Sequence, residues 1–396
     1  MSTGRSDDNI RRKRFHRLVA LALVALPPLA IGLILFAVRG TGNEPPSTNA
    51  SPATAVSMHM NPERAGWVQT TDTLLLTQDD GGSWANIMPP AVEAGAVKGT
   101  YFLDADNGWI IANGPTNATG LTPVVSWRTH DAGKTWEEFP IGDPSIDYTL
   151  ALHGSAYPYF VDLMHGWVVV KTVSSSQFSN GDLYRTADGG ATWNKQSIPL
   201  GEPVSFANEK DGAVVGGPVG NVAWVTHDGG ASWSKLAIAI PDDVSSAQVR
   251  YYTPSFFKDN RGMLPAVFAD DRATVGFYST EDAGASWALA PTTATSASVD
   301  SALSLVPDAV DADTLFAVAT DGSSIHSTVD GGANWESLAT KGLPGGVVDV
   351  AFSTKQDGWA LVITSVCAAF KENCSSTGRV FATSDGGQTW TALATS

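Results

Sequence analysis

The sequence predicts an all-β protein, a seven-bladed β-propeller with four antiparallel strands per blade, that follows an N-terminal transmembrane helix. Three observations lead to this prediction. An eight-residue phrase such as "THDGGASW" (226–233) occurs seven times, a Gly-Trp phrase precedes many of its copies, and residues 18–38 contain no charged side chain. Repeats of 40 to 50 residues that each hold four short strands are typical of propeller blades.

The first element that the sequence predicts is a membrane anchor. Residues 1–17 include the basic run "RRKRFHR", and residues 18–38 are apolar. At about 1.5 Å of rise per residue, such a helix crosses a hydrocarbon core of about 30 Å. The positive-inside rule places residues 1–17 in the cytoplasm and the propeller on the extracytoplasmic side of the cell membrane. A cleaved signal peptide is the alternative, but its apolar region is shorter and "AVRG" is a poor cleavage site.

A tether is expected between this anchor and the propeller. Residues 39–55 contain "GTGNEPPSTNASPATA", a small, polar and Pro-bearing sequence that suits a flexible linker. The propeller is then expected over residues 56–396.

The repeated phrase is the main evidence for the blades. Every copy has Thr seven residues, Asp five residues and Gly three residues before its Trp, and from Trp84 to Trp390 the copies recur on average every 51 residues. The copies are "TQDDGGSW" (77–84), "THDAGKTW" (129–136), "TADGGATW" (186–193), "THDGGASW" (226–233), "TEDAGASW" (280–287), "TVDGGANW" (328–335) and "TSDGGQTW" (383–390).

Each residue type in the phrase has a structural role. An Asp side chain accepts hydrogen bonds from the backbone of its own turn, Gly adopts a positive φ, and Trp buries a large apolar surface between neighbouring sheets. We therefore interpret these residues as fold-forming and not as seven catalytic or metal sites. They are Asp79, Asp131, Asp188, Asp228, Asp282, Asp330 and Asp385, with Trp84, Trp136, Trp193, Trp233, Trp287, Trp335 and Trp390.

A second phrase marks the middle of each unit. Gly-Trp occurs at Trp67, Trp109, Trp167 and Trp359, and "DGAVVGG" (211–217), "RGMLPAVF" (261–268) and "DADTLFAV" (311–318) are degenerate versions. Each unit reads as apolar run, turn, Gly-Trp run, loop, run ending in Thr, Asp-Gly turn and Trp run, which is four short strands. Closure is expected from packing of the last blade against the first, and a strand exchanged between the termini stays open.

Strand alternation places the loops on two faces. The turns between strands one and two share a face with the Asp-containing turns, while the two-to-three loops and the connections between blades share the other face. That second face carries the variable segments, where binding residues usually lie. The candidate binding residues there, or at the mouth of the central channel, are Tyr148, His153, Arg250, Tyr251, Arg272 and Lys371.

The net charge of the predicted propeller limits the classes of partner that it can bind. Residues 40–396 contain 17 basic and 38 acidic residues, a net charge of −21, which disfavours binding to nucleic acid and to anionic lipid headgroups.

Cys367 and Cys374 enclose six residues, and outside the cytoplasm we expect them to form a disulfide; two free thiols are the alternative. No metal site and no cofactor is expected. "DADNG" (104–108) begins like a calcium loop but lacks its later ligands, so it is interpreted as an Asp-rich turn.

The repeated phrase resembles the Asp box, or BNR repeat, of sialidases, sortilin-type receptors and other propellers, over residues 56–396. In that family the box is the turn between the third and fourth strands. A sialidase would add an Arg-Ile-Pro signature and an arginine triad. Arg-Ile-Pro is absent, and Arg128 and Arg185 share one register before the box Thr. Sequence alone does not exclude three arginines that converge in space.

Within this group, "YFLDADNGWIIANG" (101–114) and residues 206–233 resemble the repeat of the photosystem II stability/assembly factor family, which joins F-x-D-x-x-x-G-W to T-x-D-G-G-x-T-W. The resemblance implies a non-catalytic propeller that helps to assemble a membrane complex. We expect a binding scaffold for another membrane or envelope protein. A glycan- or cell-wall-binding module and a divergent sialidase-like glycosidase are the alternatives.

Overall fold

The computed structural model describes the propeller region of the chain. The residues it describes are 54–61, 64–93, 95–142, 155–242, 244–268, 274–290, 303–319, 322–367 and 374–394.

These residues form seven antiparallel sheets, each built from strands that are consecutive in the sequence. We call the sheets blades one to seven. Their strands are β1 (Ala55–Met60), β2 (Gly66–Thr70), β3 (Leu74–Thr77) and β4 (Ala85–Asn86); β5 (Val97–Phe102), β6 (Gly108–Asn113), β7 (Val124–Thr129) and β8 (Glu137–Ile141); β9 (Ala156–Phe160), β10 (Gly166–Ser174), β11 (Ser179–Thr186) and β12 (Asn194–Gln196); β13 (Val204–Phe206), β14 (Gly212–Gly216), β15 (Val222–Thr226) and β16 (Ser234–Leu236); β17 (Val249–Tyr251), β18 (Ser255–Phe256), β19 (Gly262–Phe268), β20 (Thr274–Thr280) and β21 (Ala288–Leu289); β22 (Leu303–Ala309), β23 (Leu315–Ala319), β24 (Ile325–Thr328) and β25 (Glu336–Ser337); β26 (Val347–Phe352), β27 (Gly358–Cys367), β28 (Cys374–Thr383) and β29 (Thr391–Ala392).

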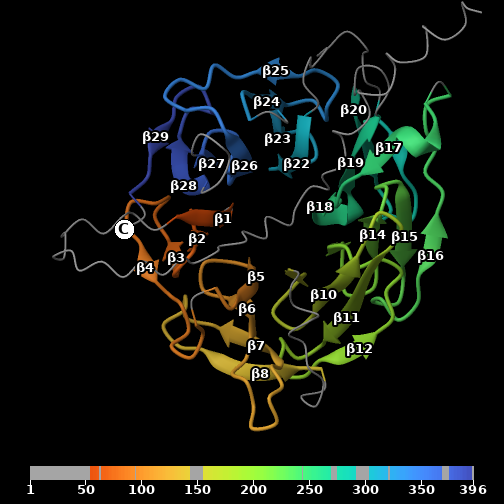
Figure 1. The fold of residues 1–396 in the computed structure, drawn as a ribbon. Coiled ribbons are helices and arrows are strands. Elements are labelled where there is room, and N and C mark those ends of the chain that lie inside the picture. The colour runs from red at the N-terminus through yellow and green to blue at the C-terminus, as the bar shows by residue number, and fades with distance from the viewer. Residues whose placement is uncertain are drawn as a thin grey trace, which may run out of the picture. The chain divides into compact units, whose positions relative to one another are not determined.

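The seven blades follow one another around a ring, with the first strand of each blade innermost and the last outermost (Figure 1). An apolar cluster fills each space between successive blades. The ring closes in the same way, because Met58 and Val68 of blade one pack with Trp359 and Val380 of blade seven. The predicted seven-bladed propeller is confirmed, and among the described residues no strand is exchanged between the first and last blades.

Blade five departs from the four-strand pattern. Its inner strand is split into β17 and β18, which both pair with β19. Pro254 lies between the two pieces and has no backbone N–H to donate to a ladder. Two short 3-10 helices, Ser246–Gln248 and Lys258–Asn260, flank this region.

The Asp-box turns are alike in all seven blades. In each, the Asp Oδ1 accepts the backbone N–H of the residue four positions on at 2.8–2.9 Å, and Oδ2 accepts that residue's side chain at 2.6–2.7 Å. The box Thr hydroxyl donates to the Asp and accepts the N–H of the Gly three residues before the Trp. The predicted capping role of the Asp is confirmed.

The same turns confirm which loops share a face. The residue after each box Asp has a positive φ, and its N–H donates at 2.9–3.0 Å to a carbonyl of the turn between strands one and two of its own blade. The next residue is the Gly three positions before Trp, with φ between 77° and 93°. A Cβ would be strained in that conformation, which explains why the position is always Gly.

The deepest aromatic packing lies at the Gly-Trp phrase. In blade three, Phe160 lies opposite Gly166 in the ladder, where a Cβ would come 2.3 Å from its ring. Phe160 also stacks on Trp109 of blade two, with ring centroids 3.6 Å apart. Trp167 and Phe206 repeat this stack one blade further at 3.5 Å. A Trp from one blade and a Phe from the next therefore fill the interface between them.

The box tryptophans lie between sheets as predicted, but most are only partly buried. Each packs into the cluster that its blade shares with the preceding blade, and only Trp390 is less than 9% exposed, at 5%. Trp109 and Trp167 of the Gly-Trp phrase are fully buried. The larger share of the apolar burial thus belongs to the Gly-Trp phrase.

The predicted tail, transmembrane segment and tether at residues 1–53 lie outside the described residues. Among the residues that are described, none belongs to a helix with the length and apolar character needed to span a membrane.

Candidate functional site

The candidate binding residues fall into two groups. Tyr148, His153, Arg272 and Lys371 lie outside the described residues. Arg250 and Tyr251 lie on β17 of the inner strand layer. The Arg250 side chain is half-buried, whereas Tyr251 is 8% exposed and packs edge-on against Tyr278 in the blade core. Binding by these residues stays a prediction, and a ligand of Tyr251 would have to displace core packing.

Three inner strands carry a polar side chain at one register, opposite the Gly-Trp position, that bonds to the next blade. Tyr101 donates its hydroxyl to the carbonyl of Phe160 at 2.8 Å, and Tyr159 donates to the carbonyl of Phe206 at 2.9 Å. In blade six, Asp308 occupies the same register and accepts the backbone N–H of Phe352 at 2.5 Å. Each of these bonds joins one inner strand to the next blade.

Two carboxyl groups of this inner layer have raised pKa values. Burial raises the pKa of Asp308 to about 7, and burial together with the neighbouring Asp308 raises the pKa of Asp349 to about 7. Carboxyl groups with shifted pKa values suggest a functional site. Asp308 also accepts a hydrogen bond that joins two blades; this bond lowers its pKa, and burial outweighs it.

The two arginines that share one register before the box Thr, Arg128 and Arg185, form hydrogen bonds that hold the fold together. Arg128 donates to the carbonyls of Asp188 and Gly189 in the next blade at 3.1 and 3.2 Å and pairs with Glu137 at 2.6 Å. Arg185 reaches the carbonyl of Glu209 in the next blade at 3.2 Å. These two side chains join blades on the box face and do not converge on one point.

The Asp-rich turn and the two cysteines were also singled out by the sequence. The described residues contain no cluster of three potential metal ligands. Asp104 accepts the N–H groups of Asp106 and Asn107, which confirms the Asp-rich turn. Cys367 and Cys374 are directly opposite in the β27–β28 ladder, but nothing of their side chains is described, so the disulfide stays a prediction.

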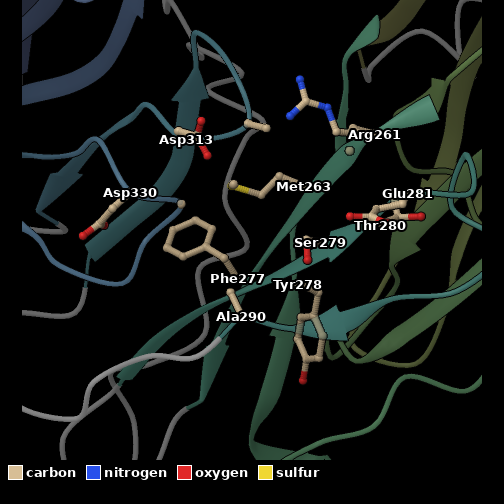
Figure 2. A pocket seen from close by; sticks show the side chains of 13 residues that line it. Arg261, Met263, Phe277, Tyr278, Ser279, Thr280, Glu281, Ala290, Asp313 and Asp330 are labelled. Carbon is tan, nitrogen blue, oxygen red and sulfur yellow. The ribbon is translucent and has the colours of Figure 1, made fainter. Parts of the chain in front are cut away.

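The box face contains a cavity of about 240 Å³ between blades five and six. Met263, Phe277 and Ala290 form its apolar wall, and Glu281, Asp313 and Arg261 lie at its polar rim (Figure 2). The complete lining is Arg261, Gly262, Met263, Phe277, Tyr278, Ser279, Thr280, Glu281, Ala290, Ala312, Asp313, Asp330 and Gly331.

Sequence reasoning missed this cavity because it expected ligands on the opposite face. The available signal was the degenerate "RGMLPAVF", where Met263 stands in place of the Gly-Trp indole. Blade six adds a second change. Ala309 lies opposite Leu315, where blades two, three, four, five and seven pair Phe with Gly. This interface therefore lacks the Gly-Trp indole and the inner-strand Phe, and Phe277 of blade five stacks on the box Trp335 of blade six instead, with ring centroids 5.3 Å apart.

Solved structures with a similar fold include both binding proteins and enzymes. YCF48 bound to D1 peptide is 17% identical, with a TM-score of 0.51, over 78% of this chain and 90% of that one. YCF48 from Cyanidioschyzon merolae is 16% identical, with a TM-score of 0.52, over 85% of this chain and 97% of that one. The GH74 xyloglucanase from Xanthomonas campestris is 14% identical, with a TM-score of 0.54, over 86% of this chain and 54% of that one. These likenesses concern the fold.

Sequence comparisons cover smaller parts of the chain. The family described as sortilin, neurotensin receptor 3, matches residues 275–396. Xyloglucanase Xgh74A of Acetivibrio thermocellus is 28% identical over 162 residues, which is 35% of this chain and 17% of that protein. The chain therefore aligns with less than a fifth of this relative.

Proposed function

We propose that this protein is a membrane-anchored, extracytoplasmic propeller that binds another membrane or envelope protein and catalyses no reaction. The observation that carries the proposal is the distribution of its carboxylates. The box aspartates and Asp308 already accept hydrogen bonds from the backbone of the propeller. Glu281 and Asp313 have no ion pair among the described residues and lie at the rim of a cavity.

Charge and fold support a protein partner. The acidic surface, at −21 for residues 40–396, favours a basic or neutral partner. One of the similar propellers, YCF48, is bound to a D1 peptide, so this ring architecture is compatible with peptide binding.

Affinity capture of the full-length protein from its own membranes, with crosslinking before solubilisation, tests this function. A membrane or envelope protein should be recovered reproducibly with the wild type. Recovery of no reproducible partner across independent preparations would count against the scaffold function.

A glycan-active or glycan-binding propeller is the second candidate. The 162-residue match to a xyloglucanase favours it, and a sialidase-like activity is a further form of the same alternative. Incubation of the full-length protein with xyloglucan and with sialosides separates these functions, because release of shorter sugars requires catalysis and retention on the polysaccharide requires a binding surface.

The membrane anchor is tested separately. Full-length protein should resist alkaline extraction from membranes, and a variant without residues 18–38 should be extracted. Added protease should reach the propeller only from the extracytoplasmic side.

A further inference from the structure

The structure assigns the cavity between blades five and six to an arginine side chain of the partner polypeptide. This inference rests on the protein-binding function proposed above and names the chemistry of the site. It follows from a comparison of this cavity with the same position at the other interfaces between blades, where side chains of the chain itself fill the space.

The interface between blades two and three shows how the chain itself can fill this space. Trp109 and Arg128 lie opposite each other in the β6–β7 ladder. The Trp109 indole N–H donates to the carbonyl of Gly189 at 2.8 Å, and the Arg128 guanidinium donates to the same carbonyl at 3.2 Å. An indole and a guanidinium of the chain itself thus satisfy one backbone carbonyl of the next box. Trp167 and Arg185 are the corresponding ladder pair of blade three.

Blade five has neither a Trp nor an Arg at these two positions. Met263 and Ser279 form the ladder pair at this register. The box residue of blade six that corresponds to Gly189 is Gly331, and it lines the cavity. A Met–Ser pair fills less volume than a Trp–Arg pair, and neither side chain reaches across with a strong N–H donor.

Other interfaces that lack the Trp are filled by different residues. Blade four has Ala213 at this register, but there Phe256 lies 3.0 Å from a Cβ placed on box residue Gly284. Blade six has Phe316, which stacks on Phe352 with ring centroids 3.4 Å apart. At the interface between blades five and six the corresponding inner-strand residue is Ala309, and the ring beside the box is Phe277, 2.6 Å from a Cβ placed on Gly332. Phe277 forms one wall of the cavity and leaves the space beside Met263 and Gly331 open.

The charges at the cavity favour a guanidinium over an indole. Glu281, Asp313 and Asp330 contribute three carboxylates, and Arg261 contributes the one cation of the lining. The Asp330 carboxylate is engaged by its own box turn. Glu281 and Asp313 are exposed, and neither has a hydrogen bond or ion pair from its side chain to another described residue. An arginine could bond these carboxylates and the Gly331 carbonyl with its planar set of donors, while its methylene stem packs on Met263 and Phe277.

The test uses three peptides that differ at one position. Acetyl-Gly-Arg-Gly-amide, its citrulline analogue and its tryptophan analogue are titrated calorimetrically into full-length protein in nanodiscs. The arginine peptide should bind at least about tenfold more tightly than the other two, because citrulline keeps the shape without the charge. Met263→Trp should weaken its binding at least about tenfold by filling the cavity with the indole that other blades carry.

Two exposed variants keep the test valid if Met263→Trp does not fold. Glu281→Gln with Asp313→Asn should weaken the arginine peptide, and Arg261→Ala should strengthen it by removing the competing cation. Equal binding of arginine and citrulline, preference for tryptophan, or binding that survives both Met263→Trp and the double variant would overturn the assignment. If affinity capture recovers a partner that Met263→Trp does not release, the scaffold function stands and this site assignment fails.

Discussion

The indole N–H of Trp167 donates to the carbonyl of Gly229 at 2.9 Å, across the interface between blades three and four. Trp167 comes from a Gly-Trp phrase and Gly229 from the Asp box of the next unit. At this interface, and at the one between blades two and three, the two repeated phrases of the sequence therefore bond to each other.

Trp167→Phe tests the contribution of this bond. Trp359 is the matched control, because its indole nitrogen is buried without a hydrogen-bond partner among the described residues. Both substitutions remove similar volume, but only Trp167→Phe removes a hydrogen bond. Its loss of unfolding free energy in urea should exceed that of Trp359→Phe by about 1 kcal/mol. Equal losses would show that the bond contributes nothing.

Asp228→Ala tests the capping role of the box. The Ser232 side chain and backbone N–H hold the pKa of Asp228 at about 2. A depressed carboxyl pKa stabilises the fold above pH 4, and that stabilisation is lost as pH falls toward 2. The variant should lose about 1 kcal/mol at neutral pH, as for other lost backbone caps, and should show a flatter stability profile between pH 4 and 2. Asp242→Ala, an exposed residue outside the boxes, should leave both unchanged.

Asp308→Asn tests the bonds of the inner strands to the next blade. The raised pKa of Asp308, about 7, means that the folded protein retains a proton that the unfolded chain releases above pH 4. Stability from this group is therefore greatest below pH 4 and falls as pH rises to 7. Asn keeps an acceptor for the Phe352 N–H without the charge, so the variant should be more stable than wild type at pH 7. Its slope should be smaller than that of the wild type, with the part that buried Asp349 contributes remaining. A lower stability at pH 7 would indicate that the charged carboxylate is the stabilising form.

Alkylation tests the predicted disulfide. Cys367 and Cys374 are opposite each other in the β27–β28 ladder, which suits a bond outside the cytoplasm. Protein isolated without reductant should resist alkylation at both cysteines, and reductant should make both reactive. Two thiols that react before reduction would contradict the prediction.

The sequence predicted the blades well because the box is a local structure. Its Thr, Asp and Gly lie within five residues and bond one another, so the pattern can be read without knowledge of the rest of the fold. The two faces followed from strand alternation, and the hydrogen bonds between the turns confirm them.

The cavity and the bonds of the inner strands could not be read in this way. The cavity depends on Met263 and Ala309, which are far apart in sequence and meet only because neighbouring blades pack together. Tyr101 and Asp308 have unlike side chains, yet they occupy one register and bond the same position of the next blade. Such equivalence appears only once the ladders are known.

Site-specific photocrosslinking of the full-length protein in its own membranes tests the central claim most directly. One photoreactive residue replaces Ala312 at the cavity on the box face, and a control replaces Thr119 on the opposite loop face. The account predicts that a partner protein is crosslinked from position 312 and that Met263→Trp abolishes the adduct. A partner adduct formed from position 119 alone, or from neither position, would contradict it.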